Sequence, residues 1–501
     1  MLSGIPPLVK ERRPSPALAL LIVLVVAAIL RIAATLTIGD VDALHGDEGY
    51  YVRGARALAA GDGYPGSLRP PGYAAFLAVA LSIGDGSLRV ARLAQVGVAL
   101  LGIAAVFALV QRRFGATAAA LSALLCALHP TLIFYSHLFW SETVVATLLL
   151  LAFVCLDRFD LERREGWLLL AGTVLGAAVL TRDMLLFFVP VVVLWLWVDS
   201  NSPNSPSVPS ASRRLRVRQA LLVIVPVVLM ILPWMVRNRA LNGRGFALST
   251  NSWFPIAIGN LIPRDRVLGM GDENREFNRA YYAVDGGELE RDAFARAAAL
   301  RAIAERQPGW LVRKLVRNSY YLFSTASQLK RFVKENWVAS GWRAMARRLT
   351  AVEAAFYVLQ MALGIVALWL VPGGRIKQLV VALILFHWAV YVIANATNRF
   401  RVPLLPFLLL YVGPLLDGYG RRGRVVRWRL AGAALCLAAF AAIVVTPYVR
   451  RAAVAGDEAS PEAALGAPRD LGRSEVTERL QGLDRFRIRL GRADGGRQPQ
   501  A

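Results

Sequence analysis

Cysteine is scarce in this chain, and its few positions do not imply a disulfide framework. The 501 residues include three cysteines, Cys126, Cys155 and Cys436, and all three lie inside apolar segments. None of them has a metal-ligand spacing such as C-x-x-C. We interpret them as small core residues, because unpaired cysteine packs like a small apolar side chain.

Other common signatures are also missing. The sequence has no glycine-rich phosphate loop next to a strand, so it does not indicate a nucleotide-sugar or ATP site. It has no internal repeat. The first apolar run is too long for the core of a signal peptide and lacks an Ala-x-Ala-type cleavage site. We therefore interpret this run as an uncleaved membrane anchor.

Apolar residues, in contrast, dominate the composition. Hydrophobic residues make up 56% of the chain and the mean hydropathy is +0.47, whereas soluble domains are roughly 45–50% apolar. An apolar run of about 20 residues can cross a bilayer as a helix. The sequence therefore predicts an all-α polytopic membrane protein with eleven spans, near 17–38, 89–110, 117–136, 142–157, 167–181, 183–198, 219–236, 351–371, 378–394, 402–418 and 430–447.

The basic residues indicate topology. The formal net charge of +24 would suggest nucleic acid in a soluble protein, but here the basic residues punctuate the apolar runs. They cluster after every second crossing, and short loops rich in Lys and Arg stay in the cytoplasm. With the N-terminus inside, the loop 39–88 and the segment 237–350 are predicted to lie outside.

Three polar stretches complete the predicted organisation. Residues 199–218 are a cytoplasmic linker that begins with a run of Ser, Pro and Asn, and residues 452–501 form a polar, partly disordered tail after the last span, 430–447. The outer segment 237–350 has helical periodicity. Within it, aromatic and basic residues are mixed over 310–330, which fits either a helix at the lipid headgroups or ordinary packing against the spans.

The first outer loop holds the residues that best fit chemistry. Asp47 and Glu48 follow the first span by less than ten residues, and Arg69 precedes Pro70 and Pro71 about two dozen residues later. A carboxylate at the membrane face can take a proton from a hydroxyl, and a nearby arginine can hold a phosphate. Asp47 also stands where a helix could begin, so a plain N-cap is the alternative.

Several short motifs resemble those of the family 39-type glycosyltransferases. These motifs are Gly-Asp-Glu-Gly-Tyr-Tyr-x-Arg at 46–53, Arg-Pro-Pro-Gly-Tyr at 69–73, Leu-Thr-Arg at 180–182, Pro-Trp-x-x-Arg-Asn at 233–238, Thr-Asn to Gly-Asn at 250–260, and Arg-Phe-Arg-x-Pro at 399–403. The family includes protein O-mannosyltransferases and lipid A aminoarabinose transferases, and has the GT-C fold. The resemblance covers roughly residues 15–420, so the region 1–420 is expected to be the GT-C transmembrane unit.

The resemblance implies an inverting transfer of a hexosyl or pentosyl group from a polyprenyl phosphate to an acceptor hydroxyl. Asp47 matches the family's catalytic aspartate, and Glu142 stands where some relatives carry a second acidic residue. Either could instead serve a helix start. The implied substrate-binding residues are Glu48, Tyr51, Arg53, Arg69, Tyr73, Arg182, Arg399 and Arg401. Interfacial snorkelling is the alternative for Arg399 and Arg401. Tyr50 stands where aminoarabinose transferases have Arg, so the identity of their donor sugar cannot be carried over to this chain.

The resemblance also sets expectations for partners and location. We expect a polyprenyl-phosphate-linked sugar, a glycan, lipid or protein acceptor, surrounding membrane lipid and no nucleic acid, in a bacterial inner membrane with the site on the periplasmic side. No cofactor is predicted. A divalent metal is the alternative, because His45, His137 and Glu142 can share the outer face with Asp47 and Glu48, although their spacing matches no ligand motif. A transporter, a lipid flippase or an inactive relative are the competing functions.

Overall fold

The computed structural model describes residues 15–37, 43–198, 213–243, 245–261, 272–335, 337–338, 340–419 and 427–458. These residues form helices and contain no strand, as the all-α prediction requires. The predicted linker lies outside the described residues up to 212, and the predicted tail does so from 459. Its first residues, 452–458, continue the last helix.

Seven helices in the described part of the chain are long and apolar enough to cross a membrane. They are α1 (Pro16–Thr37), α4 (Leu88–Leu128), α9 (Arg213–Asn242), α16 (Arg343–Leu370), α17 (Gly374–Ile393), η3 with α18 (Asn398–Leu404 and Leu405–Leu416), and the first twenty residues of α19 (Arg427–Glu458). The chain is therefore a multi-pass membrane protein.

The predicted number of eleven spans is not confirmed. The predicted spans 89–110 and 117–136 fall largely on α4, which bends at Gly115 (φ +86°) and is followed by the short α5 (Pro130–Tyr135). The helices α7 (Gly166–Thr181) and η1 with α8 (Asp183–Phe188 and Val189–Trp197) are apolar but shorter. Helix α6 (Glu142–Glu162) has acidic residues near both ends. α7 and η1 with α8 thus differ from the seven candidate spans in length, and α6 differs from them in charge.

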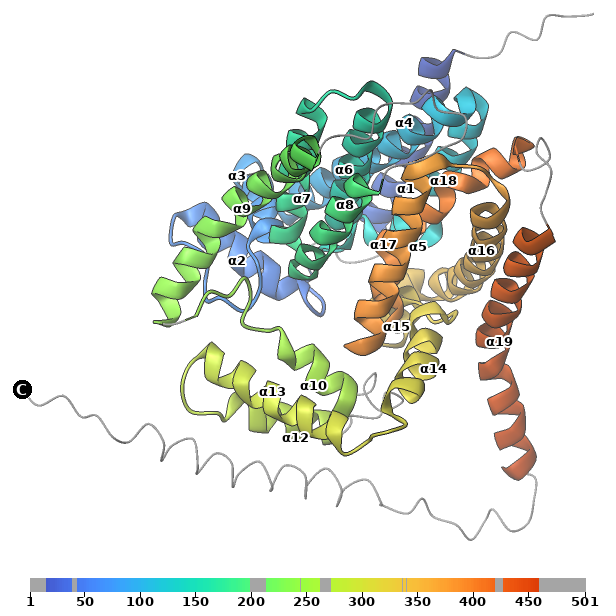
Figure 1. Ribbon diagram of the computed structural model, residues 1–501. Helices are drawn as coiled ribbons and strands as arrows, with labels where there is room; N and C mark the ends of the chain where they lie inside the picture. The colour runs from blue at the N-terminus through green and yellow to red at the C-terminus, as the bar shows by residue number, and fades with distance from the viewer. Residues whose placement is uncertain are drawn as a thin grey trace, which may run out of the picture.

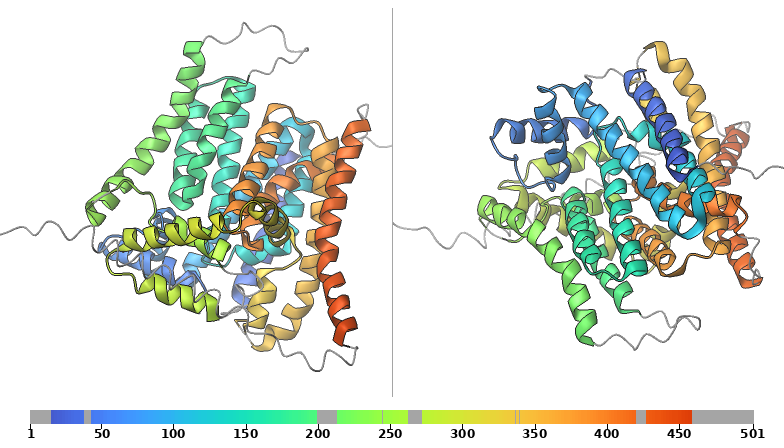
Figure 2. Two further views of the ribbon diagram at one scale, coloured as in Figure 1. Left: turned by 60° about the horizontal axis from the view of Figure 1, so that its bottom comes forward. Right: turned by 90° about the horizontal axis from the view of Figure 1, so that it is seen from above.

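Small residues bring the helices of the bundle close together. A Cβ atom on Gly172 of α7 would lie 2.5 Å from the carbonyl oxygen of Val223 on α9, and one on Gly413 of α18 would collide with the carbonyl of Ala118 on α4. Helices in lipid associate through such close packing because no water is expelled between them. The resulting bundle is the upper part of Figure 1, and Figure 2 shows it from two further sides.

The outer segments fold into helices of their own. The first outer loop contains α2 (Glu48–Ala60) and α3 (Gly72–Ile83). The outer cap, defined as α10 (Trp253–Leu261), α12 (Asp272–Tyr282) and α13 (Glu288–Ala304), has a separate core built around Phe277, Ala295 and Ala299. Figure 1 shows the outer cap below the bundle, at the same end as α2. The chain then continues through α14 (Trp310–Phe323), α15 (Gln328–Lys334) and η2 (Ser340–Trp342).

Two basic residues of helix α14 have partners inside the protein. Its Lys314 is buried and donates to the carbonyl oxygens of Gly259 (2.7 Å) and Ala394 (3.1 Å), while Arg317 donates to Gly259 at 3.1 Å. Cations at the C-terminal carbonyls of a helix are favourable because those carbonyls carry partial negative charge. These two basic residues therefore hold the end of α10, as packing predicts, and are not directed at lipid headgroups.

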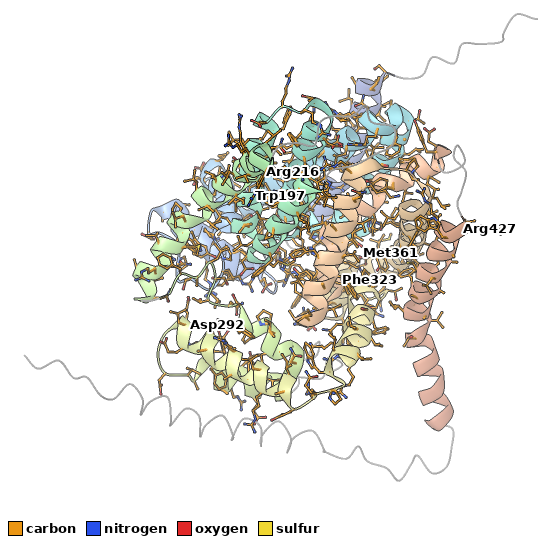
Figure 3. All side chains as sticks on the ribbon, in the orientation of Figure 1. Trp197, Arg216, Asp292, Phe323, Met361 and Arg427 are labelled. Carbon is orange, nitrogen blue, oxygen red and sulfur yellow. The ribbon has the colours of Figure 1, made fainter. Side chains whose placement is uncertain are left out.

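The opposite end of the bundle gathers paired charges. Arg113 contacts Asp157 (2.6 Å) and Asp160 (3.1 Å), and Arg375 contacts Asp160 at 3.2 Å. Figure 3 shows Trp197 and Arg216 at this end and Asp292 of α13 at the other. The short basic loops predicted to be cytoplasmic thus lie away from the outer cap.

Candidate active site

The site is built around Asp47, the residue directly before α2. Its carboxylate accepts from Arg69 Nη2 through Oδ1 at 3.1 Å and from Arg399 Nη1 through Oδ2 at 2.6 Å. Asp47 makes no side-chain capping bond, although it occupies the N-cap position of α2. Asp47 thus stands at the helix start, as the N-cap alternative expects, but its side chain does not cap the helix. Its side chain is 32% exposed and that of Arg69 is 27% exposed, so both remain reachable.

Arg399 links Asp47 to a second carboxylate. Its guanidinium contacts Glu142 through two nitrogens, Nε to Oε1 and Nη2 to Oε2 (3.3 Å), and Arg182 approaches the same Oε1 at 3.4 Å. Glu142 is fully buried. A buried carboxylate needs such partners, because an unpaired charge in this environment is costly. Asp47, Arg69, Glu142, Arg182 and Arg399 thus form one network of alternating charge.

The charges around Asp47 set its protonation. Burial alone would raise the pKa of Asp47, but the charges and hydrogen bonds of Arg399 and Arg69 outweigh burial and hold the pKa well below its ordinary value. Asp47 is therefore ionised over the physiological pH range.

Aromatic side chains surround the two arginines. Arg69 donates to the hydroxyl of Tyr51 at 3.1 Å and lies over the rings of Tyr50 (5.0 Å) and Tyr51 (5.2 Å). Arg399 lies over Trp140, 4.0 Å from the ring centroid. Such cation–π contacts hold the planar guanidinium groups in place while leaving their edges free for hydrogen bonds.

Glu48 faces away from this network. It is buried and accepts from Arg92 Nη1 (3.0 Å) and the backbone N–H of Phe139 (2.7 Å) through Oε1, and from the N–H of His45 (2.8 Å) through Oε2. Arg92 in turn donates to the carbonyls of Ala43 and His137. A direct substrate contact by Glu48, as predicted, does not fit this geometry. The pair instead ties α4 to the segment that presents Asp47.

Three other predicted residues also lie apart from the network. Arg401 is buried and donates to the carbonyls of Leu322, Ser324 and Ala326, which rules out snorkelling for it. Tyr73 is buried and donates to Gln95 at 2.5 Å. Arg53 is exposed on α2. The first two have structural partners, and none of the three is among the contacts of Asp47.

The sequence reasoning missed Arg92 and Trp140. A signal for Arg92 was available, because a charged residue inside the apolar run 89–110 is rare enough to require a partner. For Trp140 there was none, since an aromatic residue near a membrane boundary is ordinary.

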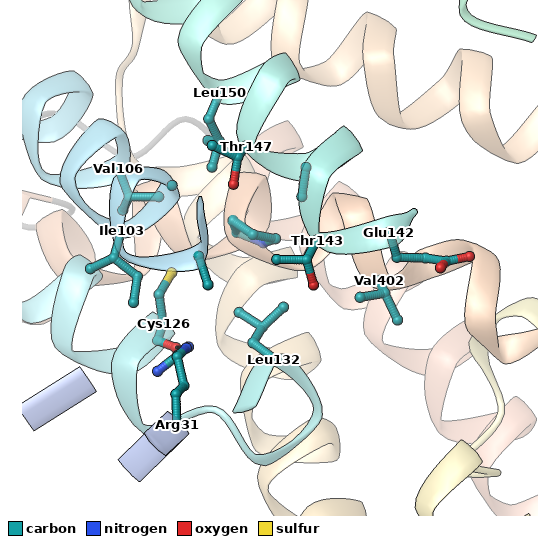
Figure 4. Close-up of a pocket in the computed structure, with 14 residues that line it drawn as sticks. Arg31, Ile103, Val106, Cys126, Leu132, Glu142, Thr143, Thr147, Leu150 and Val402 are labelled. Carbon is teal, nitrogen blue, oxygen red and sulfur yellow. Dashed lines mark hydrogen bonds between the residues drawn. The ribbon is translucent and has the colours of Figure 1, made fainter. Parts of the chain in front are cut away.

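An apolar cavity lies beside the network (Figure 4). It is small, with a volume of about 40 Å³, and its lining includes Ile103, Leu132, Thr143, Leu150 and Val402, with Glu142 at one side. Arg31 lines the far side, where it donates to the carbonyls of Cys126 and Ala127 at the C-terminal end of α4.

The described residues contain no group of three or more His, Cys, Asp or Glu side chains placed to hold a metal ion. His137, one of the residues considered for this role, is buried, and burial lowers the pKa of its imidazole to about 3. The two carboxylates that do approach each other, Asp47 and Glu142, are bridged by Arg399.

A family model matches part of the chain. Residues 68–236 match the model described as dolichyl-phosphate-mannose-protein mannosyltransferase. Over this region the chain is similar to a family of glycosyltransferases, which supports the predicted family resemblance. The all-helical structure with long apolar helices agrees with the predicted fold class. None of the curated proteins matches the chain.

Solved structures with similarity to this chain include an oligosaccharyltransferase and ArnT. The apo oligosaccharyltransferase of Archaeoglobus fulgidus has 16% identity and a TM-score of 0.47 over 87% of this chain and 55% of its own. The chain thus spans about half the length of that protein. ArnT from Cupriavidus metallidurans in the apo state has 18% identity and a TM-score of 0.39 over 81% of this chain and 78% of its own. The same ArnT bound to undecaprenyl phosphate has 16% identity and a TM-score of 0.38 over 79% and 76%.

Proposed function

We propose that this protein transfers a sugar from a polyprenyl phosphate to an acceptor hydroxyl at the outer face of a bacterial inner membrane. The single observation that carries the proposal is the partly exposed Asp47 carboxylate held between Arg69 and Arg399, beside the membrane-spanning bundle. The family match, whose description names a dolichyl-phosphate-linked sugar, supports the donor class. The acceptor is a glycan, a lipid or a protein.

The proposed reaction is a single displacement. The acceptor oxygen attacks the anomeric carbon while the bond from that carbon to the phosphate oxygen breaks, and the lipid phosphate leaves as an anion. Asp47 takes the proton of the acceptor hydroxyl. Because attack and departure occur on opposite sides of the carbon, one displacement inverts the anomeric configuration.

Arg69 is proposed to hold the phosphate. An arginine presents its donors in a planar fork that matches two phosphate oxygens, and a cation there stabilises the negative charge that develops as the bond breaks. Arg69 is more exposed than Arg399, whose side chain is 13% exposed. We therefore assign Arg399 the role of bridging the two carboxylates, and Arg69 the first contact with the donor phosphate.

The ion pairs of Asp47 imply an order of events. With both oxygens bound to guanidinium groups and its pKa lowered, Asp47 is a poor base before substrate arrives. A donor phosphate competes for Arg69 and neutralises its charge, which raises the basicity of Asp47. Donor binding thus prepares the base for the acceptor.

Glu142 has a different proposed role from Asp47. It is fully buried and both of its oxygens contact Arg399. A residue in this position orients the guanidinium group that faces Asp47, and so acts on the reaction through Arg399.

The proposal is tested with the full-length protein in lipid nanodiscs. We would incubate it with a panel of labelled polyprenyl-phosphate sugars and a membrane extract, and identify the molecule that gains the label. We expect transfer by the wild-type protein and by Asp62→Asn, but not by Asp47→Asn. Asp62 is an exposed carboxylate at the end of the same loop helix, so Asp62→Asn serves as the control. In sealed proteoliposomes, label that crosses the membrane while still attached to its carrier would identify a flippase instead.

A further inference from the structure

The loop that precedes Arg69 is anchored by residues far away in the sequence. Glu288, the first residue of α13, accepts three hydrogen bonds through Oε2: from the N–H of Ser67 (2.7 Å), from Ser67 Oγ (2.5 Å) and from Thr250 Oγ1 (2.8 Å). Ser67 and Thr250 are buried. A charged acceptor makes each of these bonds stronger than a neutral one would be.

The other oxygen of Glu288 lies against the loop as well. A Cβ atom on Gly66 would be 2.5 Å from Glu288 Oε1, and Gly66 has a φ of +67°. The positive φ favours glycine, because L-residues rarely adopt it, and a larger residue would also have to displace the end of the Glu288 side chain. The loop is thus shaped to receive Glu288.

Arg237, Ser249 and Thr250 also form hydrogen bonds with this loop. Arg237 donates to the carbonyls of Tyr64 and Gly66, the N–H of Thr250 donates to the carbonyl of Ser67 (3.0 Å), and Ser249 donates to that of Leu68 (2.8 Å). The next residue along the chain is Arg69.

The far side of Arg69 is rigid too. Pro70 and Pro71 restrict the backbone, and α3 starts at Gly72, where a Cβ atom would lie 2.7 Å from the carbonyl carbon of Leu180 on α7. The backbone of Arg69 is therefore fixed by hydrogen bonds to the loop before it and by the packing of α3 after it. Its guanidinium contacts Asp47.

We infer that Glu288 is a positioning residue that sets Arg69 for the lipid-linked phosphate, so that the outer cap tunes the active site. The inference rests on the proposed function, because it gives Arg69 the phosphate. Glu288 touches neither Asp47 nor the reacting atoms. It acts through the loop 64–69, and a displacement of about 1 Å in a positioned group can lower a rate by roughly a hundredfold.

A double-mutant cycle tests this inference. Glu288→Ala should lower kcat/KM for the donor between about ten- and a hundredfold. In an Arg69→Ala background the same change should alter kcat/KM by less than about twofold, because the group that Glu288 positions is already gone. Equal effects in both backgrounds, or no effect in the wild-type background, would overturn the inference.

Glu290→Ala provides the matched control. Glu290 lies two residues further along α13 and accepts from the N–H of Gly287 at 2.8 Å, so its loss weakens the same helix start without touching Ser67. We expect it to change donor kcat/KM by less than about threefold. An effect as large as that of Glu288→Ala would assign the loss to α13 and contradict the inference. Glu288→Gln, which keeps the shape, covers the case in which Glu288→Ala does not fold.

Hydrogen exchange separates this inference from the proposed function. In the full-length protein, Glu288→Ala and Glu288→Gln should increase exchange at the amide of Ser67, whereas Glu290→Ala should not. A wild-type protein that transfers no sugar contradicts the proposed function and leaves this measurement readable. Unchanged exchange over 64–69 in both Glu288 variants contradicts the inference itself.

Discussion

The Arg399→Gln variant tests the charge network most severely, because Arg399 is its central cation. In the wild-type protein Arg399 contacts Asp47 at 2.6 Å and binds both oxygens of the fully buried Glu142. Without Arg399, Arg182 remains beside Glu142 at 3.4 Å. Removing one partner of a buried ion pair costs roughly 3–5 kcal/mol, since the other charge stays buried.

Asp47 adds little to this cost. It is about one third exposed and keeps Arg69, so solvent screens most of its loss, roughly 0–1 kcal/mol. The expected decrease in the free energy of unfolding is therefore about 3–5 kcal/mol. The assay is equilibrium unfolding in mixed micelles titrated with a denaturing detergent, with helical circular dichroism as the signal.

The double variant Glu142→Gln with Arg399→Gln distinguishes charge from packing. It leaves no unpaired carboxylate at position 142, so we expect it to recover at least about 2 kcal/mol of the loss. A loss below about 1 kcal/mol in Arg399→Gln, or a double variant as unstable as the sum of the two single variants, would refute the network.

Other variants have distinct expected outcomes. Arg69→Gln removes a cation that lowers the pKa of Asp47, so this pKa rises and the acid limb of kcat/KM moves to higher pH; a pH profile identical to the wild type would contradict this. Glu48→Gln removes the carboxylate that pairs with the buried Arg92, so the free energy of unfolding should fall by roughly 3–5 kcal/mol, and an unchanged unfolding curve would argue against the buried pair. Arg401→Met loses bonds to three carbonyls and should reduce stability while the rate per folded molecule stays within about threefold; a selective loss of rate would give Arg401 a substrate contact.

The class of protein could be predicted from the sequence, but the number of spans could not. Apolar composition alone indicates a membrane protein, because soluble domains do not contain so many long apolar runs. Counting them fails where a run is interrupted or short. Gly115 bends α4 without ending it, and the predicted span 167–181 falls on α7, an apolar helix of only 16 residues.

The first outer loop was predictable as far as Asp47 and Arg69, because both lie in motifs on one short segment. The sequence motifs also indicated arginines from other parts of the chain, but not which of them contacts Asp47. Arg399 and Arg401 are two residues apart on η3, and in a 3-10 helix with three residues per turn such neighbours point in different directions. Arg399 faces Asp47, whereas Arg401 faces the carbonyls at the end of α14 and just after it.

Glu288 shows the limit of sequence reasoning. It lies 221 positions from Ser67, in a helix whose charged residues look like an ordinary solvated first turn. Its contact with the loop depends on how the outer cap packs onto the first outer loop, and no local pattern encodes that arrangement.

The most direct test of the proposed reaction is the single-turnover rate of sugar transfer in Asp47→Asn. Asparagine keeps the shape of the side chain but cannot accept a proton, and general base catalysis typically contributes 10²–10⁴-fold. We predict a rate lower by about that factor with donor binding retained, while Asp62→Asn transfers at the wild-type rate. Transfer by Asp47→Asn within about threefold of the wild type would contradict the account.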